Sequence, residues 1–209
     1  PRLLLDVDTP ADGEALQALM LASPLMERFG EHLRSAKVRG PANVTLAMDL
    51  PLAARLGGRR IEGTLDLQKA RLSDPRWDLD FTEVSGRTRY SDQGFAAERL
   101  AVLFEGEPAE FSLQVGEQYT GQPGLAARAL LEGRFPGQVL LDRHPPLAWL
   151  KSALTGSSQW SVAVDIPKAA ADGPAPPARL SVDSDLVGTA IVLPAPLAKP
   201  DGQAMPLPL

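Results

Sequence analysis

Few side chains in this 209-residue sequence have the types and spacing that metal binding or catalysis requires. Its two histidines, His32 and His144, lie far apart, and neither has a histidine or carboxylate neighbour at a spacing typical of metal ligands. Cysteine is absent, which excludes thiolate metal sites, thiol nucleophiles and disulfides. We therefore expect no metal and no cofactor in this chain.

Two other groups of residues could in principle do chemistry. Asp78 and Asp80 alternate along one segment, so they could act as a pair of catalytic carboxylates. The regular alternation around them favours the solvent-facing side of a strand instead. Residues 57–60, GGRR, could bind an anion, but a hairpin turn with basic flanks is the commoner structure. Nucleophile-elbow, phosphate-loop and dinucleotide-binding motifs do not occur, so we predict that the chain is not an enzyme.

The charge balance excludes further classes of function. The net charge is -5 and the isoelectric point is about 5.1. With no basic stripe, neither nucleic acid nor anionic lipid headgroups are expected partners.

No apolar run reaches the roughly 20 residues of a membrane span, and no signal peptide is visible. Because the sequence begins with Pro and ends on PLPL, we interpret it as an internal fragment of a longer protein.

The elements that must position any site are mostly strands. Alternating apolar and polar residues predict antiparallel sheet with one face in water. The apolar face is covered either by a second sheet, which would give a β-sandwich, or by curling of the sheet into a trough. Helical spacing appears at 12–20 and 25–34, and a short helical connection at 137–152. Strands are predicted around 3–7, 44–50, 61–67, 77–81 (with Trp77 inward), 100–104, 111–115, 125–135, 159–166, 178–186 and 188–193.

One pattern occurs twice. Residues 44–51, VTLAMDLP, and residues 160–167, WSVAVDIP, share apolar, polar, apolar, Ala, apolar, Asp, apolar, Pro. Each copy follows an apolar strand and a Pro-containing segment, which indicates a repeated unit. Chance similarity between two amphipathic strands remains the alternative. The repeat predicts a first β-groove unit over 1–136, with its N-terminal strand and helices, and a second, truncated unit over 137–209.

Residues 84–115, VSGRTRYSDQGFAAERLAVLFEGEPAEFSLQV, resemble the recurrent unit of the AsmA-like bacterial envelope proteins, in particular the YhdP branch. The stretches LSDPRWDLDF and HPPLAWL are similar to that branch too, so the resemblance covers most of the chain. The matching positions are Gly86, Tyr90, Gly94, Leu100, Phe104, Gly106, Pro108, Phe111 and Leu113.

The resemblance implies a fold and a role. The implied fold is mostly β, a curved antiparallel sheet of repeated β units that forms an apolar groove, with short helices at the unit junctions. The implied parent is anchored in the inner membrane, lies in the Gram-negative periplasm and shields phospholipid acyl chains during transfer between inner and outer membranes. The alternative is a non-catalytic β-sandwich structural or interaction domain of an envelope protein.

The resemblance and the alternation together imply a set of groove-lining residues that would bind lipid tails. The first and last four would be equivalent positions of the two repeated units. The implied lining residues are Val44, Leu46, Met48, Leu50, Leu65, Leu67, Leu79, Phe81, Val102, Phe104, Phe111, Leu113, Val115, Trp160, Val162, Val164 and Ile166.

Overall fold

The computed structural model describes residues 2–14, 35–52, 58, 60–141, 145–168 and 176–208. Most of the two N-terminal predicted helices, His32 and His144 lie outside these ranges. The described chain is mostly β, as predicted. Its strands are β1 (Arg2–Asp12), β2 (Lys37–Arg39), β3 (Pro41–Pro51), β4 (Arg60–Asp74), β5 (Leu79–Ser91), β6 (Gly94–Phe104), β7 (Glu107–Val115), β8 (Leu125–Pro136), β9 (Leu154–Pro167), β10 (Arg179–Ser184), β11 (Thr189–Ile191) and β12 (Leu207–Pro208).

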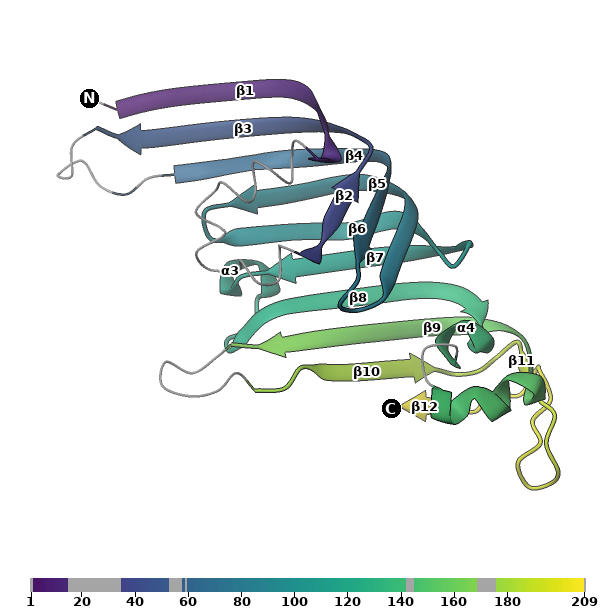
Figure 1. Ribbon diagram of the computed structural model, residues 1–209. Coiled ribbons are helices and arrows are strands. Elements are labelled where there is room, and N and C mark those ends of the chain that lie inside the picture. The colour runs from purple at the N-terminus through teal and green to yellow at the C-terminus, as the bar shows by residue number, and fades with distance from the viewer. Residues whose placement is uncertain are drawn as a thin grey trace.

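The strands form one open antiparallel sheet in nearly sequential order (Figure 1). The path runs β1-β3-β4-β5-β6-β7-β8-β9-β10-β12, with β2 paired to β4 and β11 paired to β9. Sequential hairpins suit this order because antiparallel neighbours need only short turns. Within the described ranges the strands do not form two stacked sheets, so the predicted curved sheet is confirmed over the sandwich.

Short helices fill three connections. They are α3 (Glu117–Thr120), α4 (Gly137–Leu141) and the 3-10 helix η2 (Pro145–Ala153). The last two confirm the helical connection predicted at 137–152. In the part of the chain that the structure describes, no helix has the length and apolarity to cross a membrane.

The pairing register separates apolar from polar side chains. Residues paired across antiparallel strands point to the same face. Val44 pairs with Leu65, and Leu113 pairs with Ala129, which in turn pairs with Val164. Followed through the other pairs, this face is largely apolar from β1 to β10, with Thr9 and Thr88 as polar members.

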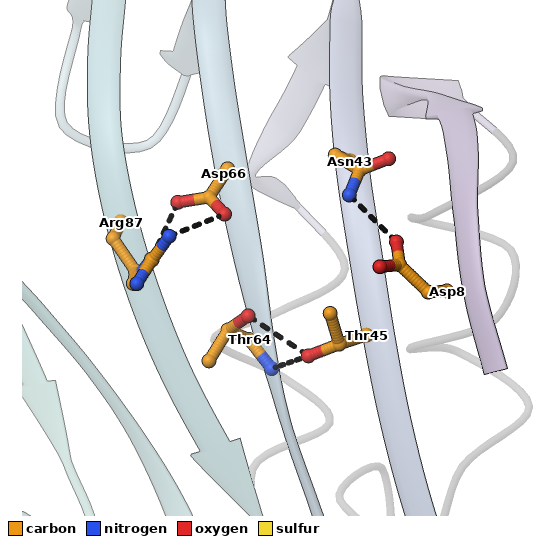
Figure 2. Close-up of polar contacts among 6 residues, drawn as sticks. All are labelled: Asp8, Asn43, Thr45, Thr64, Asp66 and Arg87. Carbon is orange, nitrogen blue, oxygen red and sulfur yellow. Dashed lines mark hydrogen bonds and ion pairs between the residues drawn. The ribbon is translucent and has the colours of Figure 1, made fainter. Parts of the chain in front are cut away.

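The opposite face carries polar partners across neighbouring strands (Figure 2). Asn43 Nδ2 donates to Asp8 at 2.8 Å, and the hydroxyls of Thr45 and Thr64 are 2.8 Å apart. Arg87 Nε donates to Asp66 at 2.7 Å. These contacts fit a solvated sheet face.

Three bulges bend the middle of the sheet. Lys69, Glu83 and Arg99 have φ values of 52°, 54° and 52°, on the neighbouring strands β4, β5 and β6. The pairing register shifts at each position, as expected where an extra residue enters a strand. Serine hydroxyls stabilise two of the bulges, because Ser85 Oγ and Ser112 Oγ accept the backbone N–H groups of Lys69 and Arg99 at 3.0 Å.

The bend folds the sheet over part of its own apolar face. In Figure 1 the β4–β5 hairpin turns out of the sheet and runs past β6 and β7, with β2 alongside. The rings of Phe81 on β5 and Phe111 on β7 are 4.7 Å apart between centroids, although β6 lies between these strands. Curling of the sheet thus builds a core without a second sheet.

The prediction for Trp77 is wrong. Trp77 lies in the turn between β4 and β5 and is 44% exposed, whereas the prediction placed it inward in a strand. Asp74 fixes this turn, since its carbonyl accepts the Trp77 N–H at 3.2 Å and its carboxylate accepts the Arg76 N–H at 3.0 Å. The local Asp side-chain bond competes with continued strand pairing.

Candidate functional site

The register places all seventeen residues predicted to line a groove on the apolar face. They differ in how far the protein itself covers them. The buried ones are Val44, Leu65, Leu67, Phe81, Val102, Phe104, Phe111, Val115 and Trp160. The half-buried ones are Leu46, Met48, Leu50, Leu79, Leu113, Val162, Val164 and Ile166.

Five aromatic side chains form a continuous row across β5 to β9, which we call the aromatic row. Its members, in order of contact, are Phe111, Phe81, Phe104, Phe135 and Trp160. Successive ring centroids are 4.7, 5.7, 5.8 and 6.3 Å apart, within the range of favourable aromatic pairs. The Trp160 indole also donates to the Phe135 carbonyl at 3.1 Å, so its one polar group is satisfied.

Phe135 is a member that the predicted lining set missed. Its side chain is fully buried between Phe104 and Trp160. The signal was present in the sequence, because Phe135 continues the alternation of Leu131 and Gly133 in a segment that was predicted to be a strand. We call the part of the face around the aromatic row the closed half.

The other end of the same strands is less covered, and we call it the open half. It comprises the half-buried Leu46, Met48, Leu50, Leu113, Val164 and Ile166. At the two sides of the sheet its apolar residues reach solvent: Leu3, Leu5 and Leu180 are 47%, 41% and 53% exposed. The predicted set missed these three, although Leu3 and Leu5 belong to an apolar segment that was predicted to be a strand.

The middle of the open half holds a second, smaller apolar cluster. Phe95, Val115 and Ala127 are each 8% exposed, and Tyr90 and Ile166 pack against them. The Tyr90 hydroxyl donates to the Thr45 carbonyl at 2.8 Å, across the intervening strand β4. Burial raises the pKa of Tyr90.

The position of the Tyr90 side chain requires a glycine at residue 63. A Cβ atom on Gly63 would lie 2.1 Å from the Thr45 carbonyl oxygen and 2.5 Å from the Tyr90 hydroxyl. The side chain of Tyr90 thus occupies the space that a side chain at Gly63 would need. This contact fixes how β3, β4 and β5 meet in the open half.

Asp78 and Asp80 do not form the carboxylate pair that their spacing allowed. Asp80 accepts from Arg71 Nε at 2.7 Å, and this hydrogen bond lowers the pKa of the Asp80 carboxyl. Asp78 lies in the β4–β5 turn with φ 50°, so the two carboxylates do not share a strand face. Among the described residues there is also no cluster of histidine and carboxylate side chains that could hold a metal ion.

The anion-binding alternative concerned residues 57–60, of which the structure describes Gly58 and Arg60. The Arg60 guanidinium forms an ion pair with Glu62 at 2.9 Å. Arg60 is therefore already paired with a carboxylate.

The two repeated octets occupy corresponding positions. VTLAMDLP lies in β3 and WSVAVDIP in β9, and both point their apolar residues to the same face. The Asp of each octet pairs with an Arg of the adjacent preceding strand, Asp49 with Arg2 at 2.6 Å and Asp165 with Arg128 at 3.6 Å. The two contacts differ in register, because Arg128 lies directly opposite Asp165 whereas Arg2 lies opposite Pro51 and reaches Asp49 diagonally.

Comparison with known proteins shows which family the chain belongs to. The chain is 25% identical, over 206 residues, to the intermembrane phospholipid transporter YhdP of Escherichia coli (strain K12). This match covers 98% of the chain and 15% of that protein, so the chain spans about a seventh of the length of its relative. No solved structure matches the chain. The family model for the YhdP protein matches residues 1–209, and the chain therefore belongs to the YhdP protein family.

Proposed function

We propose that this chain is a segment of a lipid-transport protein whose apolar face shields phospholipid acyl chains during transfer between the inner and outer membranes. The observation that carries the proposal is the largely apolar face that the strands from β1 to β10 share, in a chain whose relative is an intermembrane phospholipid transporter. The seventeen predicted lining residues all belong to that face, and those of the open half are the ones that lipid can reach.

The physical basis is the hydrophobic effect. Each CH₂ group of an acyl chain removed from water contributes about 0.8 kcal/mol. Half-buried residues such as Leu46, Leu113 and Val164 would contact the chain without enclosing it. Apolar contacts are non-directional, so a lipid tail on this face is not tied to one position and can move sideways from one strand to the next.

The same proposal includes where the parent protein lies and how it is anchored. The parent lies in the periplasm of a Gram-negative bacterium and is anchored in the inner membrane outside this segment. The segment is non-catalytic. It comprises one groove unit over 1–136 and a second, truncated unit over 137–209, and the shared face of the two octets on β3 and β9 supports this division. Repeating the unit lengthens the face.

A pair of substitutions on β7 tests the proposal. Leu113 lies on the apolar face and its neighbour Gln114 on the polar face. In the purified full-length protein, Leu113→Asp should strongly slow phospholipid transfer between donor and acceptor vesicles, because it places a charge among the lipid tails. Gln114→Asp should leave the rate unchanged.

Folding is checked by amide hydrogen exchange of β6 to β8 in both variants. A Leu113→Asp protein with normal exchange and a normal transfer rate would contradict the proposal. The segment would then be a structural or interaction domain, which the self-filled core of the closed half would suit.

A further inference from the structure

The less covered apolar residues of the open half lie in two places. On the β1 side, Leu3 and Leu5 are 47% and 41% exposed. They pair with Leu50 and Met48 of β3, which are half-buried, and the half-buried Leu46 follows on the same face. We call Leu3, Leu5, Leu46, Met48 and Leu50 the first surface.

The other place is on the β10 side. Leu180 is 53% exposed and pairs with Val164 of β9. Val164 pairs with Ala129, and Ala129 pairs with Leu113, so these residues continue the same face as far as β7. Val164, Ala129 and Leu113 are half-buried, as is Ile166 farther along β9. We call Leu113, Ala129, Val164, Ile166 and Leu180 the second surface.

The protein covers its own side chains on the strands between these two surfaces. Val44, Leu65, Thr88 and Ala97 pair in turn across β3, β4, β5 and β6. All four are buried. A lipid tail therefore finds nothing to contact along this row.

The next row lies closer to the strand ends and is the last one that crosses β5 and β6. Leu46, Gly63, Tyr90 and Phe95 pair in turn along it, and Phe95 is 8% exposed. Beyond this row β5 and β6 end in their connecting turn at 92–93. A tail that stays on the apolar face between the two surfaces must therefore cross at Tyr90 and Phe95.

The side chain of Tyr90 is held in place at this crossing. Its hydroxyl donates to the Thr45 carbonyl at 2.8 Å, although β4 lies between β5 and β3. Two strand spacings amount to about 9–10 Å, so the ring has to lie across β4 to reach that carbonyl. It does so over Gly63, where an added Cβ would lie 2.5 Å from the Tyr90 hydroxyl. The ring thus fills the one place on this row that glycine leaves without a side chain.

From these observations we infer that Tyr90 is a barrier that divides the lipid-contacting face into the first and second surfaces. Resting on the function proposed above, a tail moves sideways within each surface and crosses between them when the Tyr90 ring leaves Gly63. That movement breaks the hydrogen bond to Thr45 and uncovers Phe95, which packs against Tyr90. Tyr90 therefore controls how readily lipid passes from one surface to the other.

A photoreactive lipid tests the division. The full-length protein is mixed with phosphatidylethanolamine vesicles that contain a phospholipid with a diazirine in its tail, and cross-linked residues are mapped by mass spectrometry. In the unaltered protein the label should attach at Leu46 on the first surface and at Leu113 on the second. It should be absent from Phe95.

Substitutions of Tyr90 test whether its ring is the barrier. Tyr90→Leu and Tyr90→Ala remove the ring from Gly63, so labelling of Phe95 should appear and should be stronger in the alanine variant. Tyr90→Phe is the matched control, because it keeps the ring and loses only the hydroxyl, and it should leave Phe95 unlabelled. Amide hydrogen exchange of β3 to β6 shows whether each variant is folded.

The contrary outcomes have distinct meanings. Equal labelling of Phe95 and Leu46 in the unaltered protein would overturn the division and leave the proposed transport function standing. A folded Tyr90→Leu variant without labelling of Phe95 would overturn the role of Tyr90. An absence of label from the whole apolar face of the unaltered protein would contradict the proposed function itself.

Discussion

The two halves of the apolar face share one sheet and one sequence pattern, yet their side chains differ in how far the protein buries them. On β6, Phe104 in the closed half is 2% exposed, whereas on β10, Leu180 beside the open half is 53% exposed. Both occupy alternate positions of an amphipathic strand. Alternation therefore determines which face a residue points to, and the curl of the sheet determines whether that face is covered.

The curl has a local cause in the bulges at Lys69, Glu83 and Arg99. They bend β4, β5 and β6 and bring the hairpin over the closed half, so that Phe81 can reach Phe111. The open half lies on the other side of these bulges. On β4, β5 and β6 these bulges thus separate the self-filled core from the less covered part of the face.

The largest expected effect is a cavity in the closed half. Phe104→Ala removes a ring that contacts Phe81 and Phe135, and it should reduce the opening free energy of β5 to β9 by about 3–5 kcal/mol. Hydrogen exchange of the full-length protein measures this loss. Leu180→Ala, beside the open half, should change the opening free energy by less than about 0.5 kcal/mol. Equal losses in the two variants would show that the halves are equally packed.

Glycine substitutions compare the turns at the two ends of β6. Gly94 and Gly106 have φ values of 145° and 85°. A Cβ on Gly94 would lie 1.9 Å from the Val115 carbonyl oxygen, whereas a Cβ on Gly106 meets no atom within 4 Å. Gly106→Ala should therefore cost only the left-handed backbone strain, about 1–2 kcal/mol. Gly94→Ala should reduce stability more than Gly106→Ala, and the loss is measured as increased protease sensitivity of β6 and β7. A greater loss in Gly106→Ala would contradict the turn geometry.

A smaller effect is expected from the hydroxyl of Tyr90 in the open half. Tyr90→Phe removes its hydrogen bond to the Thr45 carbonyl and should reduce stability by about 1 kcal/mol. Since burial raises the Tyr90 pKa, the folded state keeps its proton at a pH where the unfolded chain loses it. Stability should then fall with rising pH above the ordinary tyrosine value of about 10.

Hydrogen exchange of β3 to β5 as a function of pH measures this dependence. The part due to Tyr90 should be missing in Tyr90→Phe. An unchanged pH profile in that variant would mean that Tyr90 does not titrate as the geometry requires.

The smallest effect is expected on the polar face. Arg87 is bonded to Asp66, and this hydrogen bond raises the Arg87 pKa. The guanidinium is exposed to solvent, so salt screens the pair and its contribution to stability is slight. Arg87→Gln should change hydrogen exchange less than Tyr90→Phe does, and any change should diminish in high salt. A large, salt-independent loss would show that this face is packed against another part of the protein.

Much of this architecture could be predicted from the sequence. The alternation around Val44, Leu113 and Val164 predicted the strands and their common face, because a period of two is a direct property of extended backbone. The octets predicted two strands with the same alternation, and β3 and β9 point the apolar residues of the octets to the same face.

Which parts of that face the rest of the protein buries could not be predicted in the same way. Lys69, Glu83 and Arg99 stand where the apolar alternation slips by one position, but nothing in their residue type announces a positive φ. Contacts between β5 and β7 join residues separated by an intervening strand, so local pattern does not reveal them. The separation into closed and open halves therefore becomes visible in the structure.

Site-specific photo-cross-linking in cells that make the full-length protein tests the central claim most directly. The probe is placed at Leu113, at Leu46, and at Gln114 as the control on the opposite face. The account predicts that phospholipid is captured at Leu113 and Leu46 and not at Gln114. If the probe captures no phospholipid at either leucine, protein covers the open half as well, and the lipid-shielding function is contradicted.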